Sequence, residues 1–475
     1  MSSKNTEYSV LSTQHSVLHV KGATAMPKTY DVVIVGAGPA GLMAAKVAGE
    51  NGLSVALLER KDSITTIQRS CATMFAIEDD YYFGERMYFN EESKRLVFPV
   101  TGFSLPYDGP YKNFYAWHLY TSDAQHIIRL GSYEVNRQRG PKARLSVTYS
   151  KHHLLEHLLA DAQKAGVQVV TGANVIGFRR QGDINYLTTA EGATYAGIFI
   201  IAADGINSRL VKLLGLNKDR SFYGTLMGVS YYMTGLDLPY PEAINYPMLF
   251  HKETQYPIMI WIEPSPFDED EFWVYVGGPS HPAISYKDEL DRFISSSPFS
   301  PWFPRPEVRR MQAHVANIWS PAPVPFKDNV LIAGDAGWTV EAECTGSMMC
   351  GLKAAYAIAE ALREHKPTAE GVQSYSRWWY EHFPNAMDYT EFLQLLSSTL
   401  VGEDRANYLY KLVTDVLPCS LNPYNLFKGV NASIMSKIGQ IQQERPEIIT
   451  MMQKASTLPI RHQMRGFIST GFPNT

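Results

Sequence analysis

The sequence predicts an α/β fold in which a parallel sheet is assembled from separated pieces of the chain, with a second, antiparallel sheet inserted between them. Strand-type apolar runs at 29–36 and 53–60 flank a helix-type segment at 39–52, and two strands joined through a helix pair in parallel. Later apolar runs at 195–205 and 329–337 contain similar glycine turns. The stretch 221–319 between them is aromatic, strand-like and broken by prolines, which is typical of an antiparallel sheet.

The remaining elements are predicted in chain order. An amphipathic helix is expected at 149–166, closed by its final glycine, and another at 347–365. Beyond 366 the pattern is mostly helical and aromatic, which predicts helices that cap the second domain. The predicted organisation is a flexible tail at 1–28, a discontinuous first domain at 29–90, 145–215 and 328–366, a second domain at 91–144 and 216–327, and a C-terminal helical region at 367–475.

Composition narrows the class of protein. The chain has 475 residues and a net charge of −4, so no overall basic field indicates a nucleic acid partner. Charged residues make up 19% and aromatic residues 12%, which favours either a large apolar pocket or an aromatic core. The four cysteines fit neither a zinc site nor a disulfide framework, so no metal is expected. Without a signal peptide or an apolar span, the predicted location is cytoplasmic, with peripheral membrane contact left open.

A glycine motif marks the first turn of the predicted βαβ unit. Gly36, Gly38 and Gly41 fit the pattern in which one glycine makes the turn, one lets the backbone approach a pyrophosphate and one packs helix against strand. Glu59 ends the second strand, where a carboxylate binds ribose hydroxyls. The alternative is a glycine turn of another α/β protein. The position of strand, helix and acid together favours a dinucleotide site.

Two further turns indicate which dinucleotide. Asp204-Gly205 and Gly334-Asp335 each follow an apolar strand. With the glycine motif, they resemble the glutathione-reductase-like FAD fold, in the branch that contains p-hydroxybenzoate hydroxylase and geranylgeranyl reductase, over residues 29 to 365. The resemblance implies an α/β fold with a discontinuous Rossmann-like FAD-binding domain, an inserted antiparallel-sheet substrate domain and a C-terminal helical region. It also implies that Asp335 bonds the ribityl or ribose part of FAD, and that the helix after it directs its N-terminus at the flavin.

The resemblance supplies most of the predicted cofactor-binding set. That set is Gly36, Ala37, Gly38, Pro39, Ala40, Gly41, Glu59, Arg60, Cys71, Lys151, Val175, Asp204, Gly205, Gly334, Asp335, Gly346 and Ser347. Lys151 stands where the family has an arginine that contacts FAD, which keeps the charge and loses the planar fork of donors.

Three stretches of the sequence indicate which branch of this FAD fold the chain resembles. Cys71 matches the cysteine that lies near the flavin ring in geranylgeranyl reductases, although a buried thiol without function is the alternative. Trp261 and Pro264 match an aromatic-Trp-x-aromatic-Pro segment, with Glu263 where the family prefers an aromatic residue. Trp261 is therefore expected either to wall the substrate cavity or to fill the sheet core.

The region after Asp335 departs from both branches. Gly337-Trp338 replaces the histidine that the hydroxylases usually carry, and Thr345-Gly346-Ser347-Met348 replaces the reductases' Thr-Gly-Glu-Gly. The stretch 341–350 holds Glu341, Glu343, Cys344 and Cys350. Either Glu343 or Cys344 is a candidate proton donor, unless the acids face solvent and the thiols pack.

Three functions follow in order of preference. The first is an FAD-dependent oxidoreductase that moves a hydride from reduced flavin N5 to a C=C bond of a hydrophobic, isoprenoid-type or activated alkene, with Cys71 or Cys344 as acid and Trp261 at the substrate. The second is a flavin monooxygenase or halogenase, for which the first Trp of the halogenase segment is replaced by Met259. The third is a non-enzymatic flavin-bound sensor. The expected electron donor is NAD(P)H or a redox protein.

Overall fold

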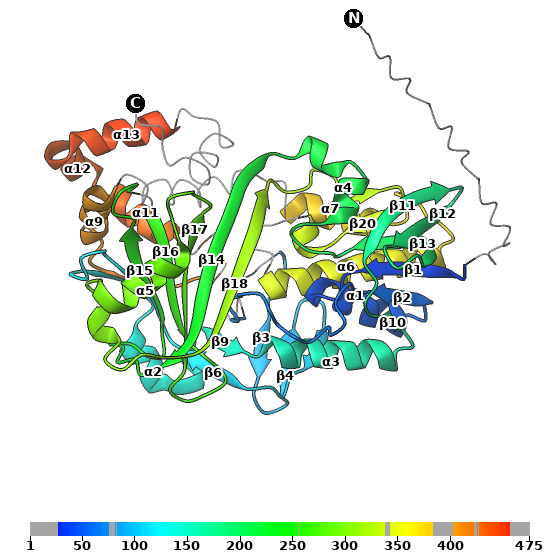
Figure 1. Cartoon of the computed structure of the whole chain (residues 1–475), viewed down its shortest axis with the longest axis horizontal. Coiled ribbons are helices and arrows are strands. Elements are labelled where there is room, and N and C mark those ends of the chain that lie inside the picture. Colours follow the sequence, from blue (N-terminus) through cyan, green and yellow to red (C-terminus); the bar gives the residue numbers. More distant parts are fainter. Residues whose placement is uncertain are drawn as a thin grey trace, which may run out of the picture.

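The computed structural model describes residues 27–75, 81, 83–255, 257–337, 343–382, 402–421, 425 and 427–456. Its two large sheets occupy opposite halves of the molecule, as Figure 1 shows. The first sheet has the order β10 (Gln168–Val170), β2 (Val55–Leu58), β1 (Thr29–Val35), β13 (Thr194–Ala202), β12 (Ile184–Thr189) and β11 (Val175–Gln181), and β20 (Val330–Ile332) pairs with β13 and with β19 (Phe326–Lys327).

The centre of the first sheet is parallel and buried on both faces. Val32 of β1 lies opposite Val55 of β2 and Phe199 of β13, and all three side chains are buried. Runs of valine and isoleucine suit such strands because helices cover both faces of a parallel sheet. Helix α1 (Pro39–Glu50) follows β1 and packs against α3 (Lys151–Lys164) and α6 (Glu343–Arg363).

The second sheet is mostly antiparallel and is built from the inserted part of the chain. Its order is β18 (Glu307–Trp319), β14 (Phe222–Thr234), β17 (Phe272–Pro279), β16 (Pro257–Pro264), β15 (Ile244–Phe250), β7 (Trp117–Tyr120), β8 (Ile127–Leu130) and β21 (Val416–Leu417). Alternation assigns its two faces. Ile258, Ile260 and Ile262 join the core beneath α5 (Tyr286–Ser296), so Trp261 and Glu263 point to the opposite face.

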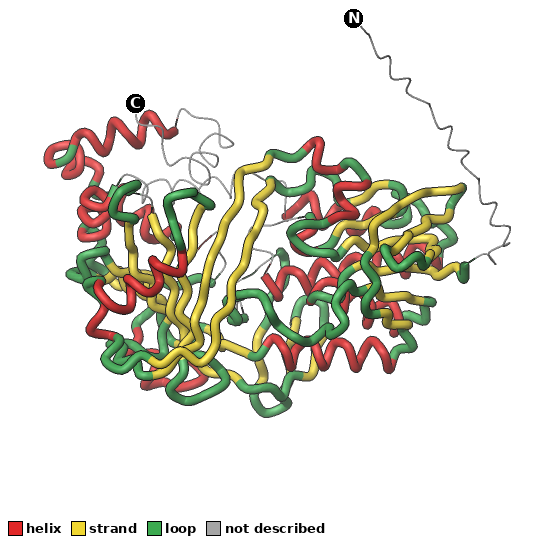
Figure 2. Tube along the Cα trace, viewed as in Figure 1, coloured by secondary structure: helices red, strands yellow, loops and turns green. Residues whose placement is uncertain are grey.

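The remaining elements are shorter. They are β3 (Tyr88–Asn90), β4 (Arg95–Phe98), β5 (Phe103–Pro106), β6 (Tyr111–Phe114), α2 (Tyr133–Arg139), β9 (Ser146–Tyr149) and α4 (Arg209–Leu213), with short 3-10 turns at Gly140–Ala143, Leu216–Asp219, Ser300–Trp302 and Gly334–Ala336. The long strands β14 and β18 reach the first half, as the tube in Figure 2 makes plain, and Ala316 and Ile318 of β18 share a core with α1 and α6.

The described C-terminal helices pack in two places. Helices α9 (Glu403–Lys411), α11 (Lys428–Met435), α12 (Ile438–Glu444) and α13 (Pro446–Ser456) cover β7, β8 and β15, as expected of a cap on the second sheet. Helix α7 (Gln373–His382) was expected in the same cap, and that expectation is wrong. The indole of Trp379 donates to the Ala322 carbonyl at 2.9 Å, and Tyr375 bonds the carbonyl of Ile332 in β20. These buried aromatic side chains fix α7 against the first half.

Two element assignments also differ from expectation. Helix α6 begins at Glu343, four residues before the predicted start, because buried Cys344 and Thr345 extend its apolar face although threonine and glycine are weak helix formers. Strand β21 lies in a region expected to be helical, and it adds to the edge of the second sheet beside β8. Within the described residues no helix has both the length and the apolar character needed to cross a bilayer. The domain boundaries stay predictions.

Candidate functional site

The glycine turn after β1 has almost no room for side chains at two of its three glycines. Gly36 has φ +98°, and a Cβ there would lie 2.3 Å from the Ala203 carbonyl oxygen. A Cβ on Gly41 would lie 1.8 Å from the Gly36 oxygen. Gly38 has no atom within 4 Å of a Cβ position. The turn therefore packs tightly on its inner side and leaves its backbone open at Gly38, where a phosphate could approach.

Helix α1 offers its N-terminus at this open side. Pro39 and Ala40 form its first turn, and no side chain caps the helix N–H groups. Free N–H groups at a helix N-terminus favour a phosphate. The neighbouring Ala37 N–H donates to Oε2 of Glu59 at 2.8 Å, and the Lys61 N–H donates to Oε1 at 2.9 Å. Glu59 is buried, and each oxygen keeps a lone pair with which a ribose hydroxyl could bond. Arg60, the next residue, is exposed.

The Asp-Gly turn after β13 has a structural role. The Asp204 carboxylate accepts from the Ser208 hydroxyl and from the backbone N–H of Arg209 and Leu210, at 2.8 and 3.1 Å for the two N–H groups. It therefore caps α4. The Asp204 backbone packs under Gly36, and Gly205 has φ +80°. Val175 is buried at the start of β11 and its carbonyl accepts from Arg209 at 3.3 Å. Direct contacts of these residues with a cofactor stay predictions.

The Gly-Asp turn after β20 places an acid at the start of α6. Gly334 has φ +62°, and Ser347 of α6 lies against it, with Oγ 3.1 Å from a Cβ position there. Gly346 and Ser347 lie in the first turns of this helix. Burial raises the pKa of Asp335, while the charges of Arg69 and Lys151 oppose the shift. Asp335 thus lies among cations that come from two other segments.

Two predicted thiols and the predicted lysine meet beside this acid. Lys151 Nζ donates a hydrogen bond to Cys71 Sγ at 3.6 Å. The nearby Cys344 side chain lowers the pKa of Cys71 well below its ordinary value, and Lys151 adds to the shift. The Cys71 side chain and burial raise the pKa of Cys344. We call Cys71, Cys344 and Lys151 the thiol cluster.

A short segment carries Cys71 across the face of the second sheet that lies opposite α5. We call residues 67–73 the Cys71 segment. Gln312 Nε2 donates to its Ile67 carbonyl at 3.0 Å, Ser70 and Ser230 share a hydroxyl bond of 2.8 Å, and the Thr73 N–H donates to Glu263 at 3.3 Å. These partners come from β18, β14 and β16. The segment therefore connects the second sheet to the thiol cluster.

Trp261 lies on the same sheet face, beside a carboxyl that the sequence did not predict as functional. The Trp261 indole donates to Oε2 of Glu263 at 2.8 Å. Its ring packs edge-on against Trp117, with centroids 4.7 Å apart, and clusters with Ala72, Trp273 and Tyr275. Burial raises the pKa of Glu263 to about 8, so the carboxyl is mostly protonated at neutral pH. The sequence signal that could have indicated a role for Glu263 was an acid at the position where the family prefers an aromatic residue.

Tyr149 is a second functional candidate that sequence reasoning missed. It ends β9, is fully buried and stacks on Phe75 with centroids 3.8 Å apart. Burial and the adjacent sulfurs of Cys344 and Cys71 raise its pKa well above the ordinary value. Its position shortly before Lys151 in the sequence belongs to no motif that would have indicated a function. Trp338 and Glu341, two residues of the predicted region, lie outside the described residues, as does the side chain of Glu343.

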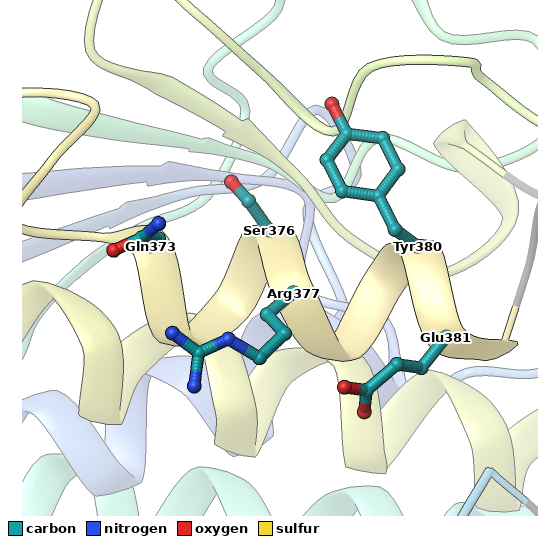
Figure 3. A pocket seen from close by; sticks show the side chains of 5 residues that line it. All are labelled: Gln373, Ser376, Arg377, Tyr380 and Glu381. Carbon is teal, nitrogen blue, oxygen red and sulfur yellow. The ribbon is translucent and has the colours of Figure 1, made fainter.

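Other parts of the described chain offer weaker sites. Figure 3 shows a surface hollow whose five lining side chains all extend from α7 and belong to Gln373, Ser376, Arg377, Tyr380 and Glu381. A hollow on one helix brings no separate segments together. Among the residues with described positions, no group of three or more His, Cys, Asp or Glu side chains is placed to hold a metal ion.

Comparisons with known proteins agree with this geometry. Residues 29–76 match the family model described as an FAD binding domain. The chain is 24% identical over 429 residues to a digeranylgeranylglycerophospholipid reductase of Methanocaldococcus jannaschii, which covers 86% of this chain and 95% of that protein. A geranylgeranyl bacteriochlorophyll reductase-like structure from Thermoplasma acidophilum aligns with a TM-score of 0.64 and 17% identity over 90% of this chain and 100% of that one.

A variant of a halogenase shares the fold as well. Its structure in complex with FAD aligns with a TM-score of 0.55 and 12% identity over 90% of this chain and 94% of that one. The open backbone at Gly38, the uncapped α1 and buried Glu59 fit FAD. The comparisons confirm the predicted α/β fold, the resemblance to geranylgeranyl reductases and the cofactor FAD. The class that they support is an FAD-dependent oxidoreductase.

Proposed function

We propose that this protein is an FAD-dependent reductase that saturates a C=C bond in a hydrophobic substrate of isoprenoid type or in an activated alkene. When bound, reduced FAD supplies the hydride for such a reaction. The observation that carries the proposal is the thiol cluster, in which Lys151 Nζ bonds Cys71 Sγ at 3.6 Å and the raised pKa of Cys344 favours its thiol form. Reduction of a C=C bond needs a proton as well as a hydride, and the cluster stores one.

The residues of the chain have distinct tasks in this proposal. The glycine turn and Glu59 hold the nucleotide end of the cofactor. Lys151 donates a hydrogen bond to Cys71 Sγ and favours its thiolate form. Cys344 gives the proton to the substrate carbon. Positioning of a protonated group at a reacting atom is the ordinary means of general-acid catalysis.

The aromatic side chains on one face of the second sheet favour a hydrophobic substrate. Trp261, Trp273 and Tyr275 form one aromatic cluster on the face opposite α5, next to Ala72 of the Cys71 segment. We therefore expect Trp261 to contact the substrate. The similarity to digeranylgeranylglycerophospholipid reductase over most of both chains adds support for an isoprenoid lipid. Such a substrate would be reached by peripheral contact with a membrane, and electrons would come from NAD(P)H or a redox protein.

The test uses the FAD-loaded protein, reduced by light under anaerobic conditions. Prenylated lipids, activated alkenes, quinones and oxygen are added separately, and flavin reoxidation is followed by absorbance with mass analysis of the product. We expect an alkene to reoxidise the flavin and gain two hydrogen atoms. Cys344→Ala should slow this reaction, while Cys419→Ala should not. Product that appears only with oxygen and carries a new hydroxyl or halogen would replace the proposal with a monooxygenase or halogenase.

A further inference from the structure

We propose that Trp273 and Glu263 form a buried subsite for an oxygen atom of the substrate, and that the substrate is an alkene conjugated with a carbonyl group. The two residues lie directly opposite each other on the neighbouring strands β17 and β16. Trp273 is 3% exposed and Glu263 is 1% exposed. The indole N–H of Trp273 has no hydrogen-bond partner among the described residues. Because buried donors are nearly always paired, this N–H points to an acceptor on a ligand.

The register of β16 and β17 orders this face of the sheet from an apolar end to a polar end. It pairs three sets of residues on the face opposite α5, namely Met259 with Gly277, Trp261 with Tyr275, and Glu263 with Trp273. Met259 and Trp261 are half-buried, whereas Glu263 is buried. An apolar chain that lies along Met259 and Trp261 therefore ends at the polar pair. This order fits a hydrophobic molecule that carries an oxygen at the end that is buried most deeply.

The Glu263 carboxyl can supply a second donor to that oxygen. Its two oxygens accept hydrogen bonds from the Trp261 indole at 2.8 Å and from the Thr73 N–H at 3.3 Å. Burial raises the pKa of this carboxyl to about 8, so its O–H is present at neutral pH. In both hydrogen bonds Glu263 is the acceptor, which leaves the O–H for a ligand oxygen.

A second indole lies at the same level of the sheet. Trp117 of β7 is opposite Ile244 of β15. Because the next residue of β15, Asn245, pairs with Ile262, Ile244 is level with Glu263. Trp117 is 3% exposed, and its N–H also lacks a partner within the part of the chain that the structure describes. The polar end of this face therefore has an unpartnered indole donor on each side of Glu263.

Donors at this place favour a C=C bond that is conjugated with a carbonyl. When a hydride adds to the far carbon of that bond, the π bond breaks and negative charge moves to the carbonyl oxygen. Donors fixed at this oxygen stabilise the charge as it develops. A proton then bonds to the carbon next to the carbonyl, and the substrate has gained two hydrogen atoms. This choice of substrate rests on the proposed function, but binding of an oxygen at the subsite does not.

The experiment compares two probes on the FAD-loaded, oxidised protein at neutral pH. Methyl farnesoate has a C=C bond conjugated with an ester carbonyl, and farnesene is a hydrocarbon of the same isoprenoid type. Affinities are measured by titration calorimetry, and the carbonyl stretch of the bound ester by infrared difference spectroscopy. We expect the ester to bind at least about tenfold more tightly than the hydrocarbon. Its carbonyl stretch should lie at a lower frequency than in hexane, because the oxygen accepts hydrogen bonds.

Replacement of the indoles tests the donors themselves. Trp273→Phe keeps an aromatic ring and removes the N–H, so the affinity for the ester should fall about tenfold while that for farnesene stays unchanged. Trp117→Phe should act in the same direction. Trp302→Phe is the matched control, since Trp302 packs against the core beneath α5, and it should bind both probes as the wild type does.

Two results on the wild-type chain would overturn the inference, and neither depends on the folding of a variant. One is equal affinity for the two probes, and the other is a bound ester whose carbonyl stretch is unshifted. A Trp273→Phe variant that loses affinity for both probes equally would reduce Trp273 to a structural role and would also refute the subsite. If the ester binds preferentially but neither it nor any other alkene reoxidises the flavin, the subsite stands and the proposed reductase function fails.

Discussion

The Glu59 carboxylate accepts hydrogen bonds from two backbone N–H groups of the protein itself. Its oxygens accept from Ala37 and Lys61, so the carboxylate fixes the glycine turn against the end of β2. The same side chain is the expected partner of the ribose. At the residue scale, one buried acid therefore orders the turn and is the predicted partner of the cofactor's ribose.

Replacement of Glu59 tests this double role. Glu59→Ala leaves the Ala37 N–H without its acceptor and removes the ribose contact. Hydrogen bonds to charged groups contribute about 1.5–3 kcal/mol, so FAD should bind roughly 10- to 100-fold more weakly, as measured by titration of the apoprotein. Glu370→Ala, at an exposed position, should bind FAD like the wild type. Equal affinity of both variants would remove Glu59 from the site.

Glu263 predicts a pH-dependent stability. Its pKa is raised from an ordinary 4.5 to about 8 by burial, against the hydrogen bonds from Trp261 and Thr73. Because the folded state holds this proton more tightly than the unfolded state, the stabilisation is complete below about pH 4.5 and is lost as pH rises towards about 8. In thermal melts from pH 5 to 9, the wild type should lose more stability than Glu263→Gln. Parallel curves would contradict the raised pKa.

At the element scale, the crossing of α1 and α6 depends on a helix glycine. A Cβ on Gly351 would lie 2.1 Å from the Ala40 carbonyl oxygen, which is backbone and cannot rotate away. Ala40 lies in the first turn of α1 at the predicted phosphate position, and α6 carries Cys344. Close contact of the two helices therefore sets the distance between the nucleotide end of the site and the thiol cluster.

Gly351→Ala should separate these helices. Overpacking of this kind costs about 1–3 kcal/mol, so we expect a lower free energy of unfolding and weaker FAD binding. Gly439→Ala is the matched control, since Gly439 is also helical and has nothing within 4 Å of a Cβ position. That change should be neutral or stabilise the protein by about 0.4–1 kcal/mol. Denaturant unfolding of both variants decides the matter, and equal losses would refute the close-contact explanation.

At the scale of the whole molecule, the Cys71 segment is one of the links between the two sheets. It bonds to β18, β14 and β16 on one side and presents Cys71 to α6 and Lys151 on the other. The position of the thiol cluster therefore depends on bonds formed far from it in the sequence.

Loss of one anchor should loosen this link without unfolding the protein. Gln312→Ala removes the bond to the Ile67 carbonyl, so amide hydrogen exchange in residues 67–73 should become several-fold faster, while exchange in β1 stays slow. Gln440→Ala, on the exposed face of α12, should leave both unchanged. Unaltered exchange in the Cys71 segment of the first variant would show that the bond does not hold it.

Local patterns were sufficient to predict β1, α1, β2 and the glycine turn, because strand, turn and helix are adjacent in the chain and each has its own residue signature. Cys71, Lys151 and Asp335 were predicted through a family resemblance, and the structure brings them together. The early start of α6 and the strand β21 were missed, since packing outweighed the weak helix preference of Thr345 and since a two-residue edge strand has no periodicity.

The sequence by itself determined the predicted nucleotide site. Gly36, Gly41 and Glu59 belong to one continuous βαβ unit, where spacing along the chain fixes position in space. Only the tertiary structure decided which side chains surround Cys71 and Glu263. The approach of Lys151 and Cys344 to Cys71, and the burial that raises the pKa of Glu263 beside Trp261, arise where two sheets meet. Burial and charge at such a junction depend on segments hundreds of residues apart, and no local pattern records them.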